Sequence, residues 1–390
     1  MSPTGLKGAA PIERGRGDFD VPDDVAYFNT ASLAPMLRSV REAGLAALDR
    51  RSRPWEIAGE DWFRDVEQLR GLFARLVGAE PNGDGVALIP ATSYGFATAA
   101  RNLRLGAGDR VLVLAAEYPS GIYTWRRAVR RAGAEILTVR CEPGQTWTDA
   151  ILAALDDRVA IVSVPNVHWT DGALVDLPAV AARTHELGAR LVVDASQSVG
   201  AIPLDVGILR PDFLITVGYK WLLGPFGVGY MYVAEEHRDG EPLEDNWIVR
   251  AGAQDFSRLV DYRDEFQPGA RRFDVGQRTK FELVPMAVAA LSQVLAWQPA
   301  NIAAALSVVT ARIADGAAAL GLEPAEPRGP HIVGVNVPDE LRDALSRALG
   351  EARCFTAARA NAMRISPHLH VTDRDVSTLL DALETAVRGR

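Results

Sequence analysis

Short apolar runs alternate with amphipathic stretches along most of this chain after residue 85. Seven of the runs predict β-strands, at 86–90, 110–115, 135–140, 159–165, 190–196, 212–218 and 228–234. The segments between several of them, such as 94–104, 123–134 and 177–189, repeat apolar residues at helical spacing. Continuously apolar strands separated by helices indicate a mostly parallel sheet that is covered on both faces. The pattern therefore predicts an α/β fold with a seven-stranded sheet.

The two ends of the chain carry a different pattern. After an extended entry at 27–37, residues 41–51 and 60–79 have helical spacing. A long helix is predicted at 283–298, and the last ninety residues alternate helices with strands at 331–337 and 362–368. The predicted domains are a polar leader (1–24), a large domain (25–275), and a linking helix with a small C-terminal α/β domain (276–390).

Composition narrows the class of protein. With 390 residues, 48% of them hydrophobic, the chain is long enough for two or three domains and is not disordered. The net charge of −8 argues against a nucleic-acid or anionic membrane partner. The first twenty residues lack the apolar core of a signal peptide, and we find no apolar run of membrane-spanning length, so a cytoplasmic protein is expected. The only cysteines, Cys141 and Cys354, lie far apart, which predicts neither disulfides nor a metal site.

Candidate ligand-binding residues follow the predicted strands, because ligands of open α/β sheets collect beyond the carboxyl ends of the strands. Thr92 and Ser93 open a helix, where hydroxyls and backbone N–H groups bind anions, although either could simply cap the helix. Tyr118 could stack on a flat ligand or belong to the core. His168 and Trp169 lie in a polar cluster at 166–172 that exceeds what a turn requires.

An acid and a lysine end two consecutive strands. Asp194 closes an apolar strand, where a carboxylate is costly unless a cationic side chain or ligand nitrogen pairs with it. Lys220 lies between an apolar strand and a glycine-rich apolar segment. Burial there would lower its pKa and make the amine a nucleophile, unless the side chain extends to the surface.

Together, these motifs resemble a known family. An acid followed about 26 residues later by a lysine resembles the pyridoxal-phosphate (PLP) enzymes of fold type I. The run DASQS (194–198) with YKWLLGPFGVGYMYV (219–233) is similar to the class V aminotransferase superfamily, which includes cysteine desulfurases, kynureninases and isopenicillin N epimerase-like proteins. The resemblance covers roughly residues 25–385. It implies a PLP cofactor, a large domain with the seven-stranded sheet and a smaller C-terminal domain.

The resemblance also implies roles for individual residues. Lys220 matches the lysine that holds the cofactor aldehyde and moves the α-proton, and Asp194 matches the partner of the pyridine nitrogen. The other implied cofactor contacts are Gln197 at the phenolic oxygen, Thr92, Ser93 and Tyr219 at the phosphate, and Tyr118 over the ring. The implied substrate contacts are Arg364 at the carboxylate, with Asn29, His168 and Trp169 lining the substrate side; His168 could equally be structural.

A homodimer with shared active sites is implied as well. The segment 271–281 matches the stretch that passes into the neighbouring subunit's site. There Gln277 stands where a phosphate-binding threonine is usual, and Val217 replaces a serine near the lysine. Both departures leave the phosphate with fewer contacts.

The reaction is less specified than the cofactor. Gly350 stands where desulfurases carry their nucleophilic cysteine, and Cys354 is expected to be a buried thiol. The Tyr219–Lys220 pair and EYPSGIY (117–123) favour the kynureninase and carbon–sulfur lyase side, but Gly121 and Gln197 replace residues of kynureninases. We therefore expect an enzyme that acts on an α-amino acid as a transaminase or carbon–sulfur β-lyase. The alternatives are an epimerase, then a cysteine desulfurase, and last a PLP-fold binding module without turnover.

Overall fold

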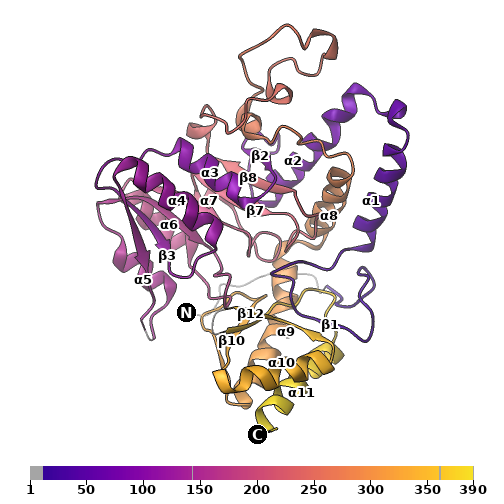
Figure 1. Cartoon of the computed structure of the whole chain (residues 1–390), viewed down its shortest axis with the longest axis vertical. Helices are drawn as coiled ribbons and strands as arrows, with labels where there is room; N and C mark the ends of the chain where they lie inside the picture. Colours follow the sequence, from indigo (N-terminus) through magenta and orange to yellow (C-terminus); the bar gives the residue numbers. More distant parts are fainter. Residues whose placement is uncertain (1–11, 143, 360–361, 390) are drawn as a thin grey trace.

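The computed structural model describes residues 12–142, 144–359 and 362–389. Its largest sheet has seven strands in the order β2-β8-β7-β6-β5-β3-β4 (Figure 1), which confirms the predicted number and fold class. The strands are β2 (Val86–Ile89), β3 (Arg110–Leu114), β4 (Glu135–Val139), β5 (Val159–Pro165), β6 (Arg190–Asp194), β7 (Phe213–Val217) and β8 (Gly229–Val233). Each lies within a residue or two of its predicted position.

Strand β8 is the exception to parallel pairing. It lies between β2 and β7 and is antiparallel to both, whereas β7, β6, β5, β3 and β4 run parallel. Two parallel neighbouring strands need a crossover connection, which is usually a helix. No helix separates β7 from β8, so the short link at 218–228 returns the chain in the opposite direction. This link carries Lys220.

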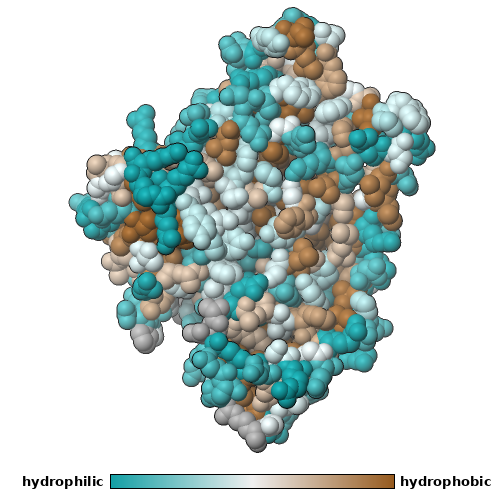
Figure 2. Space-filling view, viewed as in Figure 1, coloured by the Kyte–Doolittle hydropathy of each residue, from teal (hydrophilic) through white to brown (hydrophobic). Residues whose placement is uncertain are grey.

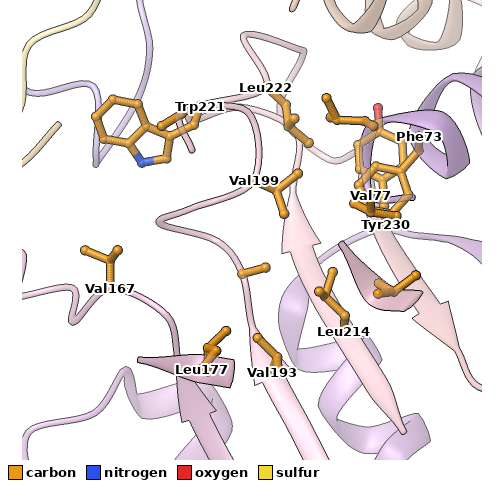
Figure 3. Close-up of a cluster of buried hydrophobic side chains, with 14 of the residues drawn as sticks. Phe73, Val77, Val167, Leu177, Val193, Val199, Leu214, Trp221, Leu222 and Tyr230 are labelled. Carbon is orange, nitrogen blue, oxygen red and sulfur yellow. The ribbon is translucent and has the colours of Figure 1, made fainter. Parts of the chain in front are cut away.

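Helices cover both faces of the sheet. On β6, Val192 packs in one apolar cluster while its neighbours Leu191 and Val193 pack in another, as alternating strand residues must. Figure 3 shows part of the second cluster, in which Phe73 stacks on Tyr230 at 4.5 Å between ring centroids. The helices of this part are α1 (Arg38–Arg51), α2 (Arg64–Leu76), α3 (Thr92–Asn102), α4 (Pro119–Ala132), α5 (Trp147–Ala154), α6 (Leu177–Glu186) and α7 (Val206–Leu209).

The C-terminal part forms a second layer below the large sheet in Figure 1. Its four-stranded antiparallel sheet has the order β12-β13-β10-β9 and packs against α10 and α11. The elements of this layer are the second half of α9 (Pro299–Ala319), β9 (Glu323–Pro324), β10 (Val333–Asn336), α10 (Arg342–Glu351), β11 (Cys354–Phe355), β12 (Ala357–Arg359), β13 (Ala362–Ile365) and α11 (Asp373–Arg388). The preceding helix α8 (Leu283–Trp297) instead packs beside α1 and α2 in the core under the large sheet. The predicted domain boundary after residue 275 stays a prediction.

The N-terminal entry belongs to this second layer. Strand β1 (Ala26–Tyr27) pairs with β11, and Ala26 and Phe28 lie in the same apolar cluster as Val333 and Ile365. The entry segment therefore packs with the C-terminal part of the molecule, although it is at the other end of the chain.

Helix α9 is long and apolar enough, by length and composition alone, to cross a membrane. Its first half, with Ile302 and Leu306, packs in the core beneath the large sheet. Its second half, with Val309 and Ile313, packs in the C-terminal core. The helix thus joins two hydrophobic cores, which explains its apolar composition.

A loop at 250–266 projects from the top of the molecule (Figure 1), and the space-filling view shows apolar side chains at that end (Figure 2). Its side chains include Val260 and Tyr262, which are 75% and 93% exposed. The same loop carries several aspartates and arginines, so these exposed apolar side chains lie among charged ones.

Candidate active site

A cavity of about 200 Å³ opens at the carboxyl ends of β2, β3, β5, β6 and β7. It is lined by Pro90, Ala91, Thr92, Ser93, Glu117, Tyr118, Ser120, Pro165, Val167, Trp169, Asp194, Ser196, Gln197, Val217, Tyr219, Lys220 and Phe226. Eight of the residues predicted to contact the cofactor or substrate are in this lining, at the edge where parallel α/β sheets bind ligands. A larger hollow, of about 1110 Å³, lies between α3 and α4 and contains none of them.

Lys220 is buried beside two aromatic rings. Its Nζ lies 5.6 Å from the ring centroid of Tyr118 and 6.0 Å from that of Tyr219. Burial lowers its pKa to about 8; the charge of Asp194 opposes this, and the charges of Arg364 and Arg359 add to it. About one molecule in ten therefore has a neutral amine at pH 7, far more than for an ordinary lysine.

The backbone before Lys220 has no room for a side chain. A Cβ on Gly218 would lie 2.8 Å from the carbonyl oxygen of Val228, so only glycine allows the 218–228 link to close against β8. The link thereby fixes where the lysine enters the cavity.

Asp194 ends β6 and has no side-chain counterion. One carboxylate oxygen accepts a hydrogen bond from the backbone N–H of Ser196 at 2.9 Å. No ion pair to an arginine, lysine or histidine within 4.0 Å involves Asp194 in the part of the chain that the structure describes. The amine of Lys220 is a cation whose charge acts on Asp194, and pairing with a ligand nitrogen stays a prediction.

Thr92 and Ser93 are the first two residues of α3, and neither caps it. The N-cap position is Ala91, and no side chain accepts a hydrogen bond from the first turn. The two hydroxyls and the N–H groups of this turn are therefore available to an anion, which the helix dipole also favours.

Gln197 is held on both sides. Its Nε2 donates to the carbonyl of Ala31 at 3.1 Å, and its Oε1 accepts from Trp221 Nε1 at 2.8 Å. Its backbone carbonyl lies 2.5 Å from His331 Nε2. One amide hydrogen remains for a cofactor oxygen, so the role implied by the resemblance stays a prediction.

His168 and Trp169 occupy different places. His168 does not line the cavity: its Nδ1 lies 2.7 Å from Thr170 Oγ1, and its Nε2 lies 3.1 Å from the carbonyl of Ala115. Trp169 lines the cavity and meets Tyr118 edge-on at 5.5 Å between centroids. Both ring nitrogens of His168 thus have partners in the protein, which favours the structural reading of this residue.

Arg364, on β13, reaches the edge of the site from the C-terminal layer. It is 1% exposed, donates to the carbonyl of Trp169 at 2.6 Å and to Ser32 Oγ at 2.7 Å. Burial, reinforced by the charge of Arg359, lowers its pKa to about 9. Asn29, from the entry segment, has a buried Oδ1 without a hydrogen-bond partner. Neither side chain lines the cavity around Lys220.

Gln277 is exposed and does not line the cavity of its own chain. Its suggested place in a neighbouring subunit's site stays a prediction. Val217, the other departure, does line the cavity and brings an apolar wall where a hydroxyl is usual.

Glu117 was not among the predicted site residues, although it directly precedes Tyr118 after an apolar strand. Its Oε1 accepts from the N–H of Tyr118 at 2.7 Å, while Oε2 is buried without a partner. Burial raises its pKa to about 7, with the charge of Asp194 adding to the rise and that of His168 opposing it. The site thus contains a carboxyl group that gains or loses its proton near neutral pH.

The variant Glu117→Gln is expected to be more stable than the parent protein at pH 8 and equally stable near pH 4.5. The folded pKa lies above the unfolded value of 4.5, so the parent loses stability as the pH rises from 4.5 through about 7. That loss amounts to about 3 kcal/mol and is absent for a neutral amide. Thermal unfolding of both proteins across this range measures it. The exposed Glu42→Gln is the control, and an identical pH profile for Glu117→Gln and the parent would contradict the burial argument.

One further cluster has the residue types of a metal site. Carboxylate and imidazole atoms of Asp212, Glu236 and His237 lie within 4.8 Å of one another. Arg190 already contacts Asp212 at 3.1 Å and Glu236 at 3.7 Å, so a guanidinium offsets part of the negative charge of the two acids. This cluster is an ion-pair network on the far side of β6 from its carboxyl end.

Fold and cavity define a class of protein: an α/β enzyme with a buried lysine and an acid that face a pocket at the strand ends, as in PLP-dependent enzymes. The family model for aminotransferase class-V matches residues 52–247. The chain belongs to this family.

Named relatives extend over most of the chain. An uncharacterized aminotransferase, YcbU, of Bacillus subtilis is 28% identical over 83% of this chain and 85% of its own length. The isopenicillin N epimerase of Streptomyces clavuligerus is 29% identical over 96% of this chain and 98% of its own. Other relatives are named kynureninase and cysteine desulfurase. The names agree on the family and differ on the reaction.

Solved structures share the fold. A cysteine desulfurase from Thermococcus onnurineus NA1 superposes with a TM-score of 0.85 at 20% identity, covering 98% of this chain and all of the other. A C-DES variant with glycine linked to its PLP cofactor gives 0.84 at 20% identity, covering 94% and 98%.

The residues present fit PLP. The cavity offers an amine for the aldehyde (Lys220) and an acid without a counterion for the pyridine nitrogen (Asp194). Thr92, Ser93 and the buried, unpartnered hydroxyl of Ser196 provide donors for a phosphate. The cofactor of this family is therefore the cofactor of this chain.

Proposed function

We propose that this protein is a PLP-dependent enzyme that acts on an α-amino acid by transamination or by carbon–sulfur β-elimination. The observation that carries the proposal is the combination of Lys220 and Asp194 in one cavity, with Arg364 at its edge. A binding module without turnover would need neither a lysine with a lowered pKa nor an acid and an arginine without counterions.

PLP, when bound, withdraws electrons from the α-carbon and so makes its proton acidic. The chain's own groups would do the rest. Arg364 would hold the substrate carboxylate, a task suited to a guanidinium without a competing acid. Lys220, with its pKa lowered to about 8, would accept the α-proton and return it. Tyr118 and Trp169 would shield the reacting carbon from water.

Two alternatives rank lower. Epimerisation is supported by the relative named isopenicillin N epimerase, which matches over nearly its whole length. Persulfide-forming desulfuration needs a reactive thiol, but burial raises the pKa of Cys354 to about 12 and Gly350 has no side chain to offer. We therefore place elimination and transamination first.

The assembly and the cellular location of the protein are also proposals. We propose a homodimer in which 271–280 approaches the neighbouring site, because this segment resembles the stretch that passes into the partner's site in this family. A cytoplasmic location is proposed from the composition of the chain.

The test is a panel of amino acids incubated with the purified, cofactor-loaded protein. Transamination is expected to convert the cofactor to pyridoxamine phosphate, and elimination is expected to release pyruvate or another 2-oxo acid together with ammonia. Inversion of the α-carbon without either product would move the assignment to epimerisation. The absence of all three with every amino acid would overturn the proposal.

A further inference from the structure

Two arginines meet at one serine beside the active site. Arg359, the last residue of β12, donates to Ser32 Oγ at 3.0 Å, and Arg364, on β13, donates to the same oxygen at 2.7 Å. The two strands pair in an antiparallel hairpin, and Ser32 comes from the entry segment. Two guanidinium groups are thus held around a single hydroxyl.

No acid neutralises either arginine among the residues that the structure describes. Neither Arg359 nor Arg364 forms an ion pair within 4.0 Å, and the Nε of each is buried without a hydrogen-bond partner. Their mutual repulsion contributes to the low pKa of Arg364. A buried arginine beside a second, half-buried one without a counterion is costly, and a bound anion reduces that cost.

The hydrogen-bond donors at this place exceed the acceptors. Ser32 Oγ has two lone pairs, and the two arginines use both, so its hydroxyl hydrogen is available to donate. Each guanidinium has five N–H donors. The protein accepts two from Arg359, at the carbonyl of Ala358 and at Ser32, and two from Arg364, at the carbonyl of Trp169 and at Ser32, so both arginines keep unused donors. One carboxylate pairs with one guanidinium in the best geometry, so two guanidiniums accommodate two anionic groups.

The arginines contact Trp169, a wall residue of the cavity, and Arg359 also lines a second hollow with Asp171 and Glu323. Arg364 bonds to the carbonyl of Trp169, and the guanidinium of Arg359 lies 5.8 Å from the centroid of the same indole ring. Trp169 lines the cavity of Lys220, and both arginine charges act on the lysine. A ligand that reaches from Lys220 to Arg359 and Arg364 would be a small molecule, because the cavity has a volume of about 200 Å³.

We propose that Arg359, Ser32 and Arg364 select amino acids whose side chain carries a second anionic group, a carboxylate or a sulfinate. Arg364 takes the α-carboxylate and Arg359 the side-chain anion. The inference rests on the proposed function, since it names the substrate class of that site.

Binding tests the charge selectivity without turnover. Succinate and propionate are titrated calorimetrically into the cofactor-loaded protein. We expect succinate to bind about 10- to 100-fold more tightly, the usual effect of a charge-assisted hydrogen bond. Arg359→Gln is expected to remove most of this ratio, and Arg359→Lys to restore part of it. Arg353→Gln, on an exposed arginine that pairs with Asp24, is the matched control and should keep the ratio.

Turnover separates the two proposals. Two ratios of kcat/KM are compared: aspartate against asparagine, and cysteine sulfinate against cysteine. Both ratios are expected to exceed one in the parent protein and to fall in Arg359→Gln. Equal use of acids and amides by the parent protein would overturn the anion selectivity and leave the proposed function standing. If Arg359→Gln lowered kcat/KM equally for the acids and for their uncharged counterparts, the anion selectivity would also be overturned. Such a result would mean that both arginines bind the α-carboxylate. Succinate selectivity without turnover of any amino acid would refute the proposed function and leave the dianion site intact.

Discussion

Replacing Lys220 with alanine is expected to lower turnover by about 10³-fold or more, since the group that moves the proton and the anchor of the cofactor are lost together. The reason lies in the environment of the amine, whose burial lowers its pKa to about 8 and so keeps a basic form available near neutral pH. The measurement is the rate with an amino acid substrate of the parent protein, together with the visible absorbance of the purified variant.

Lys220→Arg is the companion variant. It keeps a positive charge and much of the volume, but a guanidinium does not release its proton in proteins, so this variant is expected to be as inactive as alanine. Unchanged unfolding temperatures would show that neither loss comes from misfolding. Activity within tenfold of the parent in either variant would refute the role of Lys220.

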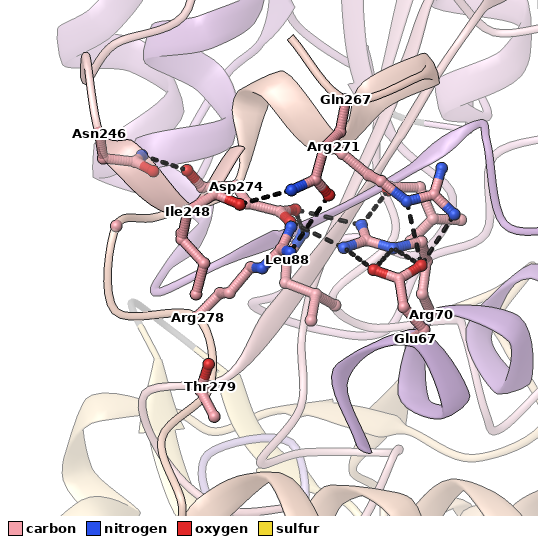
Figure 4. Close-up of polar contacts among 12 residues, drawn as sticks. Glu67, Arg70, Leu88, Asn246, Ile248, Gln267, Arg271, Asp274, Arg278 and Thr279 are labelled. Atoms are coloured by element: carbon pink, nitrogen blue, oxygen red, sulfur yellow. Dashed lines mark hydrogen bonds and ion pairs between the residues drawn. The ribbon is translucent and has the colours of Figure 1, made fainter. Parts of the chain in front are cut away.

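The second large effect is on stability. Asp274→Asn is expected to lower the free energy of unfolding by about 3–5 kcal/mol, the usual result of removing one partner from a buried ion pair. The carboxylate of Asp274 bonds to Arg70 at 2.7 Å and to Arg278 at 2.5 Å, and all three side chains are fully buried (Figure 4). It also accepts the N–H of Leu88 on β2 at 2.7 Å. An amide would leave two buried guanidiniums with one remaining acid, Glu67.

Unfolding in urea, followed by fluorescence, measures this loss. Asp239→Asn is the matched control, because Asp239 is fully exposed and pairs with Arg272 at 3.0 Å, and exposed pairs contribute less than about 1 kcal/mol. A loss for Asp274→Asn that is no larger than for the control would show that the network does not stabilise the fold.

Local patterns in the sequence were sufficient for the sheet and for the position of the site. A strand buried on both faces must be apolar throughout, so the seven strands stood out, and the residues after them had to lie at one edge. Thr92, Tyr118, Asp194 and Lys220 come together for this reason. Their presumed roles came from the resemblance and stay predictions.

Pairing between distant segments was not visible in the same way. Strand β8 lies between β2 and β7 because the chain turns back after β7 and pairs with its free edge, and β2 then pairs with β8. The entry strand β1 pairs with β11, more than three hundred residues away, because its apolar residues complete the C-terminal core. Neither arrangement leaves a periodic signal in the chain.

The sequence by itself determined the α/β class and the strand ends, since these depend on the nearest residues along the chain, while the pairing of one lysine with one acid came from the resemblance to PLP enzymes. Only the tertiary structure decided the chemical state of the site. Glu117 holds its proton more tightly because its Oε2 is buried beside Asp194. His168 is turned away into hydrogen bonds, and Arg359 meets Arg364 at Ser32. Side chains become buried, and like charges come into contact, where segments far apart in sequence meet. These contacts determine the pKa values of the site and the charge of the ligand that it favours, and no pattern of neighbouring residues shows them.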